Sequence, residues 1–235
     1  MKNIYNSILT SKNQKLLAIL LDPEKLALDS LASLVAKINT SPATHILVGG
    51  SSFDGHHLDE IIQTIKKNTD LPILLFPGNP SQISAEADGI LFLTLLSGRN
   101  PDYLIEHQVN AVPFLKKTNL EIISTGYILI ESGNETSVQK VSQTQPLKRD
   151  NAEYILQTAQ AGELIGNKLI YLEAGSGAKW AVPTEIIELV SQNITIPIIV
   201  GGGIRSKEAI ENAYKAGATM VVIGTAFEND SNFFN

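Results

Sequence analysis

An acidic residue, Glu173, stands where an apolar run ends and a glycine-rich turn begins. The run spans residues 169–172, and the turn spans residues 175–177. A carboxylate beside main-chain amides that hold an anion can deprotonate or polarise a hydroxyl nucleophile. Tyr171 lies on the same side of the predicted strand, and its electron-rich ring can stabilise positive charge on a substrate. An ion pair in the interior is the alternative for Glu173.

The same change from strand to glycine occurs twice more along the chain. Residues 198–200 lead into glycines 201–203, and residues 221–223 lead into Gly224 and Thr225. Glycine has no Cβ, so its amide can approach an anion closely. Three such turns at the ends of consecutive strands predict a phosphate site at the top of a parallel barrel.

Two residues after the first strands are candidate metal ligands. Asp22 ends the first strand just before Pro23, and Ser51 follows the second. Mg²⁺ prefers one or two carboxylates together with substrate phosphate oxygens. A helix N-cap is the alternative for Asp22, and an ordinary turn residue for Ser51. His56 and His57 lack the spacing of a metal site, so a solvated helix start is favoured there.

Three cations follow predicted strand ends. Arg205 and Lys179 can neutralise a phosphate, and Arg99 can grip a diphosphate; a surface charge is the alternative for each. Residues 175–179 lack the spacing and the final Ser or Thr of a Walker A loop. They do not match GxGxxG either, which gives dinucleotide binding little support.

Length and composition suit a single barrel domain over residues 1–235. The chain has 43% hydrophobic and 18% charged residues, enough to bury a full core. It has no cysteine, which excludes disulfides and thiolate metal sites and suits a cytoplasmic location. Its net charge of -6 argues against nucleic acid as a partner. We expect no signal peptide and no transmembrane segment, because no apolar stretch approaches the roughly 20 residues of a span.

The chain reads as strands alternating with helices. Short, unalternating apolar runs, typical of parallel strands covered on both faces, occupy residues 16–21, 45–49, 72–76, 89–93, 121–130, 168–172, 197–200 and 219–223. Helical spacing is found in residues 26–38 and 58–65. A further helix is expected to begin at Ser206 and end at Gly217, and Pro183 suits the first turn of another. This order predicts a (β/α)₈ barrel; a doubly wound open sheet is the alternative.

Two segments depart from the repeat. Between the third and fourth strands only residues 81–87 can be helical. The helix there is either trimmed, or its absence exposes an apolar groove that a long hydrocarbon can occupy. Residues 132–150 form the longest polar stretch, which is interpreted as a functional loop rather than a linker.

Four motifs give the chain a family resemblance. They are LVGGSS at 47–52, SGRNPDYLI at 97–105, YLEAGSG at 171–177 and VGGGIRS at 200–206. With them the chain resembles the geranylgeranylglyceryl phosphate synthases and their heptaprenylglyceryl phosphate relatives, and its middle part looks like the group II branch. The resemblance implies a modified TIM barrel in which the third helix is replaced by a short segment.

The resemblance also implies a reaction. The 3-hydroxyl of sn-glycerol 1-phosphate would attack C1 of geranylgeranyl diphosphate, and diphosphate bound to Mg²⁺ would leave. Asp22 and Ser51 would ligate Mg²⁺, Glu173 would activate the hydroxyl, and Tyr171 would steady the allylic cation. Glycerol phosphate would be held by Tyr171, Leu172, Glu173, Ala174, Gly175, Ser176, Gly177, Gly202, Gly203, Gly224 and Thr225.

Several alternatives stay open at this point. The donor can be longer, such as heptaprenyl diphosphate, and the homo-oligomer expected for such a protein can be a dimer or a hexamer. Contact with a membrane surface is expected only transiently, for product release. The rival enzyme is a phosphate-binding sugar-phosphate isomerase with Asp22 and Glu173 as its acid–base pair. A non-catalytic phosphate sensor is a further alternative.

Overall fold

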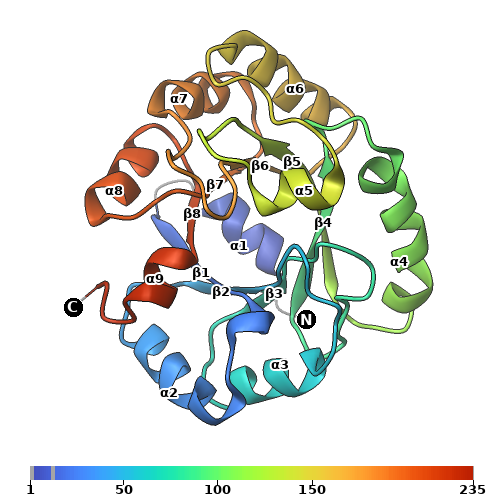
Figure 1. The fold of residues 1–235 in the computed structure, drawn as a ribbon, viewed down its shortest axis with the longest axis vertical. Helices are drawn as coiled ribbons and strands as arrows, with labels where there is room; N and C mark the ends of the chain where they lie inside the picture. The colour runs from blue at the N-terminus through green and yellow to red at the C-terminus, as the bar shows by residue number, and fades with distance from the viewer. Residues whose placement is uncertain (1–2, 12–13, 235) are drawn as a thin grey trace.

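The described residues form a closed barrel of eight parallel strands. A computed structural model describes residues 3–11 and 14–234, and its strands pair in chain order, with β8 against β1 (Figure 1). The strands are β1 (Leu16–Leu21), β2 (His45–Val48), β3 (Ile73–Leu75), β4 (Gly89–Leu95), β5 (Glu121–Leu129), β6 (Leu169–Glu173), β7 (Ile198–Gly201) and β8 (Met220–Ile223). The predicted barrel is therefore confirmed, and the open sheet is excluded.

Helices alternate with most of the strands. They are α1 (Ile4–Thr10), α2 (Leu28–Asn39), α3 (Leu58–Lys66), α4 (His107–Leu115), α5 (Ser137–Ser142), α6 (Ala152–Leu164), α7 (Thr184–Asn193), α8 (Lys207–Lys215) and α9 (Thr225–Asn229), with a 3₁₀ turn η1 (Pro23–Lys25) and a π-helix η2 (Asp102–Glu106). Ser206 caps α8 as predicted, since its side chain accepts from the Ala209 amide. Pro183 instead precedes the first turn of α7, with extended ψ of 137°.

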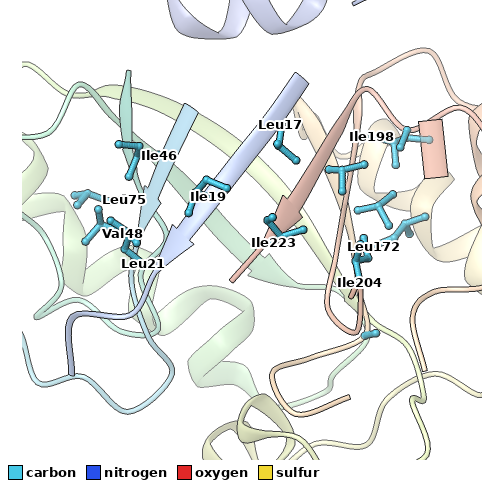
Figure 2. Packing of buried hydrophobic residues seen from close by; sticks show 14 of the residues in the cluster. Leu17, Ile19, Leu21, Ile46, Val48, Leu75, Leu172, Ile198, Ile204 and Ile223 are labelled. Carbon is cyan, nitrogen blue, oxygen red and sulfur yellow. The ribbon is translucent and has the colours of Figure 1, made fainter. Parts of the chain in front are cut away.

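Alternation along each strand divides the apolar residues into two cores. Leu17, Ile19 and Leu21 of β1 face the shell between strands and helices, together with residues such as Leu172 and Ile198 (Figure 2). Leu16 and Ala18, which alternate with them, face the barrel interior. Side chains therefore fill the middle of the barrel, as in other (β/α)₈ proteins.

Helix α1 closes the end of the barrel at which the strands begin. Ile4 and Ile8 pack into the inner core, and α1 lies at the centre of the ring of helices in Figure 1. The amides of Ile4 and Tyr5 donate to the carboxylate of Glu121, at 2.5 and 2.9 Å. Because Glu121 begins β5, α1 covers the N-terminal ends of the strands. Only the opposite end is left for a site.

The barrel wall is incomplete between β3 and β4. The two strands pair only at Leu74 with Gly89 and at Leu75 with Ile90, whereas β4 pairs with β5 along its whole length. Residues 91–95 of β4 therefore have no partner in β3. We call this gap in the strand pairing the β3–β4 opening.

No helix follows β3, as the sequence resemblance implied. The short helix considered for residues 81–87 is also absent. Side chains hold this segment as a loop: Gln82 donates to the carbonyls of Gly50 and Phe53 and accepts from the Gly78 amide. The bond to Gly78 is local, whereas the bonds to Gly50 and Phe53 tie the loop to the segment that follows β2. Among the described residues, no helix has the length and apolar character that a membrane span needs.

Candidate active site

A single cavity lies at the C-terminal ends of the strands and contains most of the predicted site residues. Its lining includes Tyr171, Glu173, Gly175, Ser176, Gly177, Gly202, Gly203, Gly224, Thr225, Asp22 and Ser51. The three glycine turns therefore border one space. Leu172 and Ala174 do not line it; their side chains pack in the outer core, and the Ala174 amide donates to the Gly201 carbonyl.

The turns after β6 and β7 are in direct contact. Gly175, Gly177, Gly202 and Gly203 have φ of 95°, 79°, 80° and 69°, values that favour glycine. A Cβ atom on Gly202 would lie 2.5 Å from the Gly175 nitrogen. Gly224 differs, because its φ is -123° and it immediately precedes α9. Main-chain groups of these turns surround the space where an anion can bind.

Glu173 is a buried carboxylate with its proton affinity raised. Only 5% of its surface is exposed, and Oε1 accepts from the Gly175 amide at 2.6 Å. Burial raises the pKa of Glu173 to about 7, against the opposing effects of the Gly175 amide, the Tyr171 hydroxyl and the Ala174 amide. No cation forms an ion pair with Glu173 in the part of the chain that the structure describes, so an interior ion pair is not its role there. The carboxyl group can take up a proton near neutral pH.

Three aromatic rings line the cavity beside Glu173. Tyr171 stacks on Phe76 at a centroid distance of 5.2 Å and tilts against Tyr127 at 5.4 Å. Strand register places Tyr127 directly opposite Tyr171. The Tyr171 hydroxyl is buried without a hydrogen-bond partner among the described residues, although it lies close enough to Glu173 to influence its pKa. We call Phe76, Tyr127 and Tyr171 the aromatic trio.

Two members of this trio cannot be recognised as site residues in the sequence. Phe76 ends the third predicted strand and Tyr127 lies within the fifth, so both occur in apolar runs that read as ordinary core. An aromatic residue at the end of a barrel strand was the available signal. Tyr127 reaches Tyr171 through the pairing of β5 with β6, and Phe76 reaches it from the end of β3 across the barrel.

An apolar groove leaves the aromatic trio through the β3–β4 opening. Its outer part is lined by Ile83, Ile90, Phe92, His107 and Ala111. Ile90 and Phe92 belong to the outer core, so the cavity runs from inside the barrel to the surface that a helix after β3 would cover. Gln108 also lines it and donates to the carbonyl of Leu93, in the part of β4 that has no partner in β3.

Asp22 and Ser51 lie on one side of the cavity. Asp22 Oδ1 accepts from the Glu24 amide at 3.2 Å, so the predicted N-cap and a place on the cavity coexist. A Cβ atom on Gly50, next to Ser51, would lie 2.6 Å from Asp22 Oδ1. No group of three His, Cys, Asp or Glu suited to a metal occurs among the described residues. One carboxylate and one hydroxyl, both oxygen donors, fit Mg²⁺ that takes its other ligands from water and a substrate.

The predicted cations separate into two kinds. Arg205 lines the cavity, and its Nη2 donates to the Ala178 carbonyl at 2.6 Å. Lys179 does not line the cavity and lies 4.7 Å over the Trp180 ring. Arg99 is also absent from the lining and binds the carbonyls of Leu96 and Gly98. Arg99 therefore holds its own loop, and the structure gives no support to diphosphate binding by it.

His56 and His57 lie away from the cavity, at the exposed start of α3. They face Asp54 and Glu60 respectively. The favoured interpretation as a solvated helix start is confirmed.

The polar segment 132–150 lies over the site. It contains α5, which starts with a capping box of Thr136 and Gln139. Val138 lines the cavity, and a Cβ atom on Gly175 would lie 2.4 Å from Thr136 Cγ2. On the other side, Tyr103 Oη donates to the Val141 carbonyl at 3.0 Å. The segment thus joins the glycine turn after β6 to η2 across the cavity.

A closed parallel barrel with glycine turns and a buried carboxylate at the C-terminal strand ends defines a phosphate-binding (β/α)₈ protein. Within this class, the model of the PcrB family matches residues 9–234. The chain belongs to the PcrB family.

Relatives match this chain over nearly its whole length. It is 64% identical over 234 residues to the geranylgeranylglyceryl phosphate synthase of Flavobacterium johnsoniae, covering 99% of this chain and 96% of the relative. Identity to the Zunongwangia profunda enzyme of the same name is 50%, with 92% of each chain covered. A crystal structure of (S)-3-O-geranylgeranylglyceryl phosphate synthase from Thermoplasma acidophilum, in complex with its substrate sn-glycerol-1-phosphate, has a TM-score of 0.92 at 34% identity. The match covers 100% of this chain and 95% of that one.

Proposed function

We propose that this protein transfers a geranylgeranyl group from its diphosphate to the 3-hydroxyl of sn-glycerol 1-phosphate. The observation that carries the proposal is the position of Glu173, between glycine turns suited to a phosphate and an aromatic trio that opens into an apolar groove. The glycine turns match a phosphate monoester, and the apolar groove matches the hydrocarbon chain of a prenyl diphosphate. The names of the relatives agree with this reaction.

The proposed chemistry balances within the site. The glycerol oxygen forms a bond to C1 of the prenyl chain as the bond from C1 to the diphosphate oxygen breaks. The electron pair leaves with diphosphate, and the hydroxyl proton goes to Glu173, whose pKa of about 7 suits a base near neutral pH. The Tyr171 ring offers its electron-rich face to the allylic carbon as positive charge grows there. The buried rings of Tyr127 and Tyr171, with the partly buried Phe76, keep water from that carbon.

Asp22 and Ser51 are the proposed holders of Mg²⁺. When bound, the ion would stabilise negative charge on the departing diphosphate. Glycerol phosphate would bind at the turns formed by Gly175, Ser176, Gly177, Gly202, Gly203, Gly224 and Thr225. These turns supply main-chain donors, and Arg205 supplies positive charge at their edge.

The apolar groove supports a prenyl donor over a phosphosugar. A sugar-phosphate isomerase has no use for Ile83, Ile90 and Phe92 in an open channel. Asp22, its supposed acid or base, already accepts from the Glu24 amide and lies 3.5 Å from Lys25. A twenty-carbon donor is the primary proposal; a longer one such as heptaprenyl diphosphate is the alternative.

One assay tests the proposal against its rivals. Purified protein receives sn-glycerol 1-phosphate, Mg²⁺ and prenyl diphosphates of several lengths, and ether products are measured by mass spectrometry. We expect product with the twenty-carbon donor and none after chelation of Mg²⁺. Isomerisation of a phosphosugar without ether product would favour the rival enzyme. Binding of phosphate ligands without any turnover would favour the sensor.

A homo-oligomer, a dimer or hexamer, is also proposed. It is supported by exposed apolar side chains on the outside of η2 and α4, among them Ile105, Val109 and Phe114, because isolated chains rarely expose such a row. Light scattering on the purified protein would give the number of subunits. Cytoplasmic location and transient membrane contact at product release stay predictions, which fractionation of cells expressing the protein would test.

A further inference from the structure

Lys25 lies on the cavity and was not singled out by the sequence. It ends the 3₁₀ turn η1, three residues after Asp22 at the C-terminal end of β1. Its Nζ is 2.9 Å from Glu228 Oε2 and 3.5 Å from Asp22 Oδ2. About half of the side chain is exposed, at 51%. The ammonium group is therefore held at the cavity wall and still open to a ligand.

The charges around the cavity are few and divide into two groups. The cavity is lined by the carboxylates of Asp22, Glu173 and Glu228, and its Lys and Arg residues are Lys25 and Arg205. Arg205 binds the carbonyl of Ala178, next to the glycine turn after β6. Lys25 lies instead beside Asp22, after β1. Each of the two places where an anion is proposed to bind thus has one cation of its own.

This division matches the charges of the proposed substrates. A diphosphate carries more negative charge than a single Mg²⁺ ion removes, and Asp22 adds a further negative charge at that place. A leaving diphosphate consequently needs another cation close to the metal ligands. Lys25 is the cation of the described lining that meets this need, because it lies 3.5 Å from Asp22, whereas Arg205 bonds the Ala178 carbonyl beside the glycine turn after β6.

We infer that Lys25 binds the diphosphate of the prenyl donor, moving from Glu228 to the phosphate oxygens when the donor enters. The inference rests on the proposed function, since that function supplies the diphosphate. Glu228 belongs to α9 and holds the ammonium group beside Asp22 until then. In the bound state Lys25 donates hydrogen bonds to the leaving group and offsets its charge as the C1–O bond breaks.

Lys25 stays charged throughout this exchange. Burial lowers its pKa, but the hydrogen bond and charge of Glu228, together with Asp22, outweigh that effect and raise the pKa above 10.5. No proton transfer by Lys25 is therefore involved. The competing explanation is structural, namely that the pair of Lys25 and Glu228 only ties η1 to α9.

The test compares binding of two anions by calorimetry. Inorganic pyrophosphate with Mg²⁺ probes the donor side, and sn-glycerol 1-phosphate alone probes the other side. For Lys25→Gln we expect the Kd of pyrophosphate to rise by about tenfold or more, as for a lost hydrogen bond to a charged group. The Kd of sn-glycerol 1-phosphate should change by less than about twofold, because the two anion sites are separate. Lys25→Arg should restore part of the loss.

Glu228→Gln separates binding from a structural tie. It breaks the same ion pair but keeps the cation, so pyrophosphate should bind as well as in the parent protein or better. Lys37→Gln is the matched control, because Lys37 is an exposed lysine of α2 that bonds Ser231 and does not line the cavity. If Lys25→Gln and Glu228→Gln lower the thermal midpoint equally and both leave the pyrophosphate Kd unchanged, the inference is overturned.

The outcome also separates this inference from the proposed function. Ether product from the parent protein, with unchanged pyrophosphate binding in Lys25→Gln, would refute the role of Lys25 alone. Absence of ether product, with pyrophosphate binding that depends on Lys25, would support the diphosphate site and refute prenyl transfer.

Discussion

The carboxylate of Glu173 occupies the space that a side chain on Gly202 would fill. A Cβ atom on Gly202 would lie 2.1 Å from Glu173 Oε1. The glycine after β7 and the acid at the end of β6 are therefore fitted to each other, and a side chain at position 202 would displace the carboxylate. The first prediction follows from this contact.

Gly202→Ala should abolish most binding of sn-glycerol 1-phosphate. The added methyl group displaces Glu173 and the Gly175 amide, and φ of 80° adds strain. Gly166→Ala is the matched control, because Gly166 has φ of 99° but nothing within 4 Å of the added Cβ. The control should lose about 1 to 2 kcal/mol of unfolding free energy, the cost of a Cβ in the left-handed region, and keep its affinity. Calorimetry and urea unfolding measure the two effects; equal affinities in both variants would contradict the prediction.

Glu173→Gln should lower kcat by about 10²- to 10⁴-fold, the usual contribution of a general base. The amide keeps an acceptor for the Gly175 N–H, so the fold and the affinity for glycerol phosphate should survive. Single-turnover measurement of ether product, with circular dichroism as the check on folding, gives the result. Turnover near that of the parent protein would remove Glu173 from its role.

The pH dependence of rate and of stability should have opposite signs. Activity needs the carboxylate, so kcat/KM should rise as pH increases through about 7. The folded protein, in contrast, binds more protons at Glu173 than the unfolded chain between pH 4.5 and 7, so this group lowers stability as pH rises through that window. Glu173→Gln should then raise the unfolding free energy relative to the parent protein by about 3 kcal/mol more at pH 8 than at pH 4.5. Urea unfolding at both pH values checks this, and a difference independent of pH would contradict it.

Tyr171→Phe and Tyr171→Leu should differ in kcat. Among the described residues the buried Tyr171 hydroxyl has no hydrogen-bond partner, although it lowers the pKa of Glu173. Its ring stacks on Phe76. If the ring stabilises the allylic cation, Phe should retain most of kcat. Leu should lose about 1 to 2 kcal/mol of transition-state stabilisation, which is the size of a desolvated cation–π contact and lowers kcat by about 5- to 30-fold. Equal losses in the two variants would assign the effect to the hydroxyl or to packing.

Ala111→Trp should shorten the accepted prenyl donor. Among the residues that line the apolar groove, Ala111 is the last in α4 and Ile90 is the first in β4. An indole at position 111 should therefore block the part of the groove farthest from the aromatic trio. We expect KM for the twenty-carbon donor to rise by about tenfold or more, with ten- and fifteen-carbon donors less affected. Val109→Trp, on the same helix but 54% exposed, is the control. Unchanged preference in Ala111→Trp would place the chain elsewhere.

The barrel and the glycine turns were predictable because their causes are local. Buried parallel strands are apolar without alternation, and β1, β2, β6, β7 and β8 end at or beside a glycine or a carboxylate that is visible in the sequence. The N-cap at Ser206 is equally local. The loop at residues 77–88 was only half predicted: Pro77 and Pro80 disfavour a helix, but the bonds of Gln82 to Gly50 and Phe53 that hold the loop are not visible in a sequence.

What escaped prediction depends on contacts between distant parts of the chain. Helix α1 is defined by its place under the barrel and by Glu121, more than a hundred residues away. Phe76 and Tyr127 become site residues only because the fold brings them against Tyr171. Lys25 is held at the cavity by Glu228 of α9, about two hundred residues further along the chain. The periodicity of apolar residues identifies a helix or strand and its buried face, but it does not show which elements pack against one another.

The β3–β4 opening gives a hydrocarbon access to the site, but it lowers the stability of the barrel. A wall joined along its full height, with a helix laid over it, would bury more apolar surface and resist unfolding better. The same improvement would leave no passage for a hydrocarbon. Substitutions that make such a protein more stable to heat are therefore expected at the other strand pairs and in the helices, and not at the β3–β4 opening.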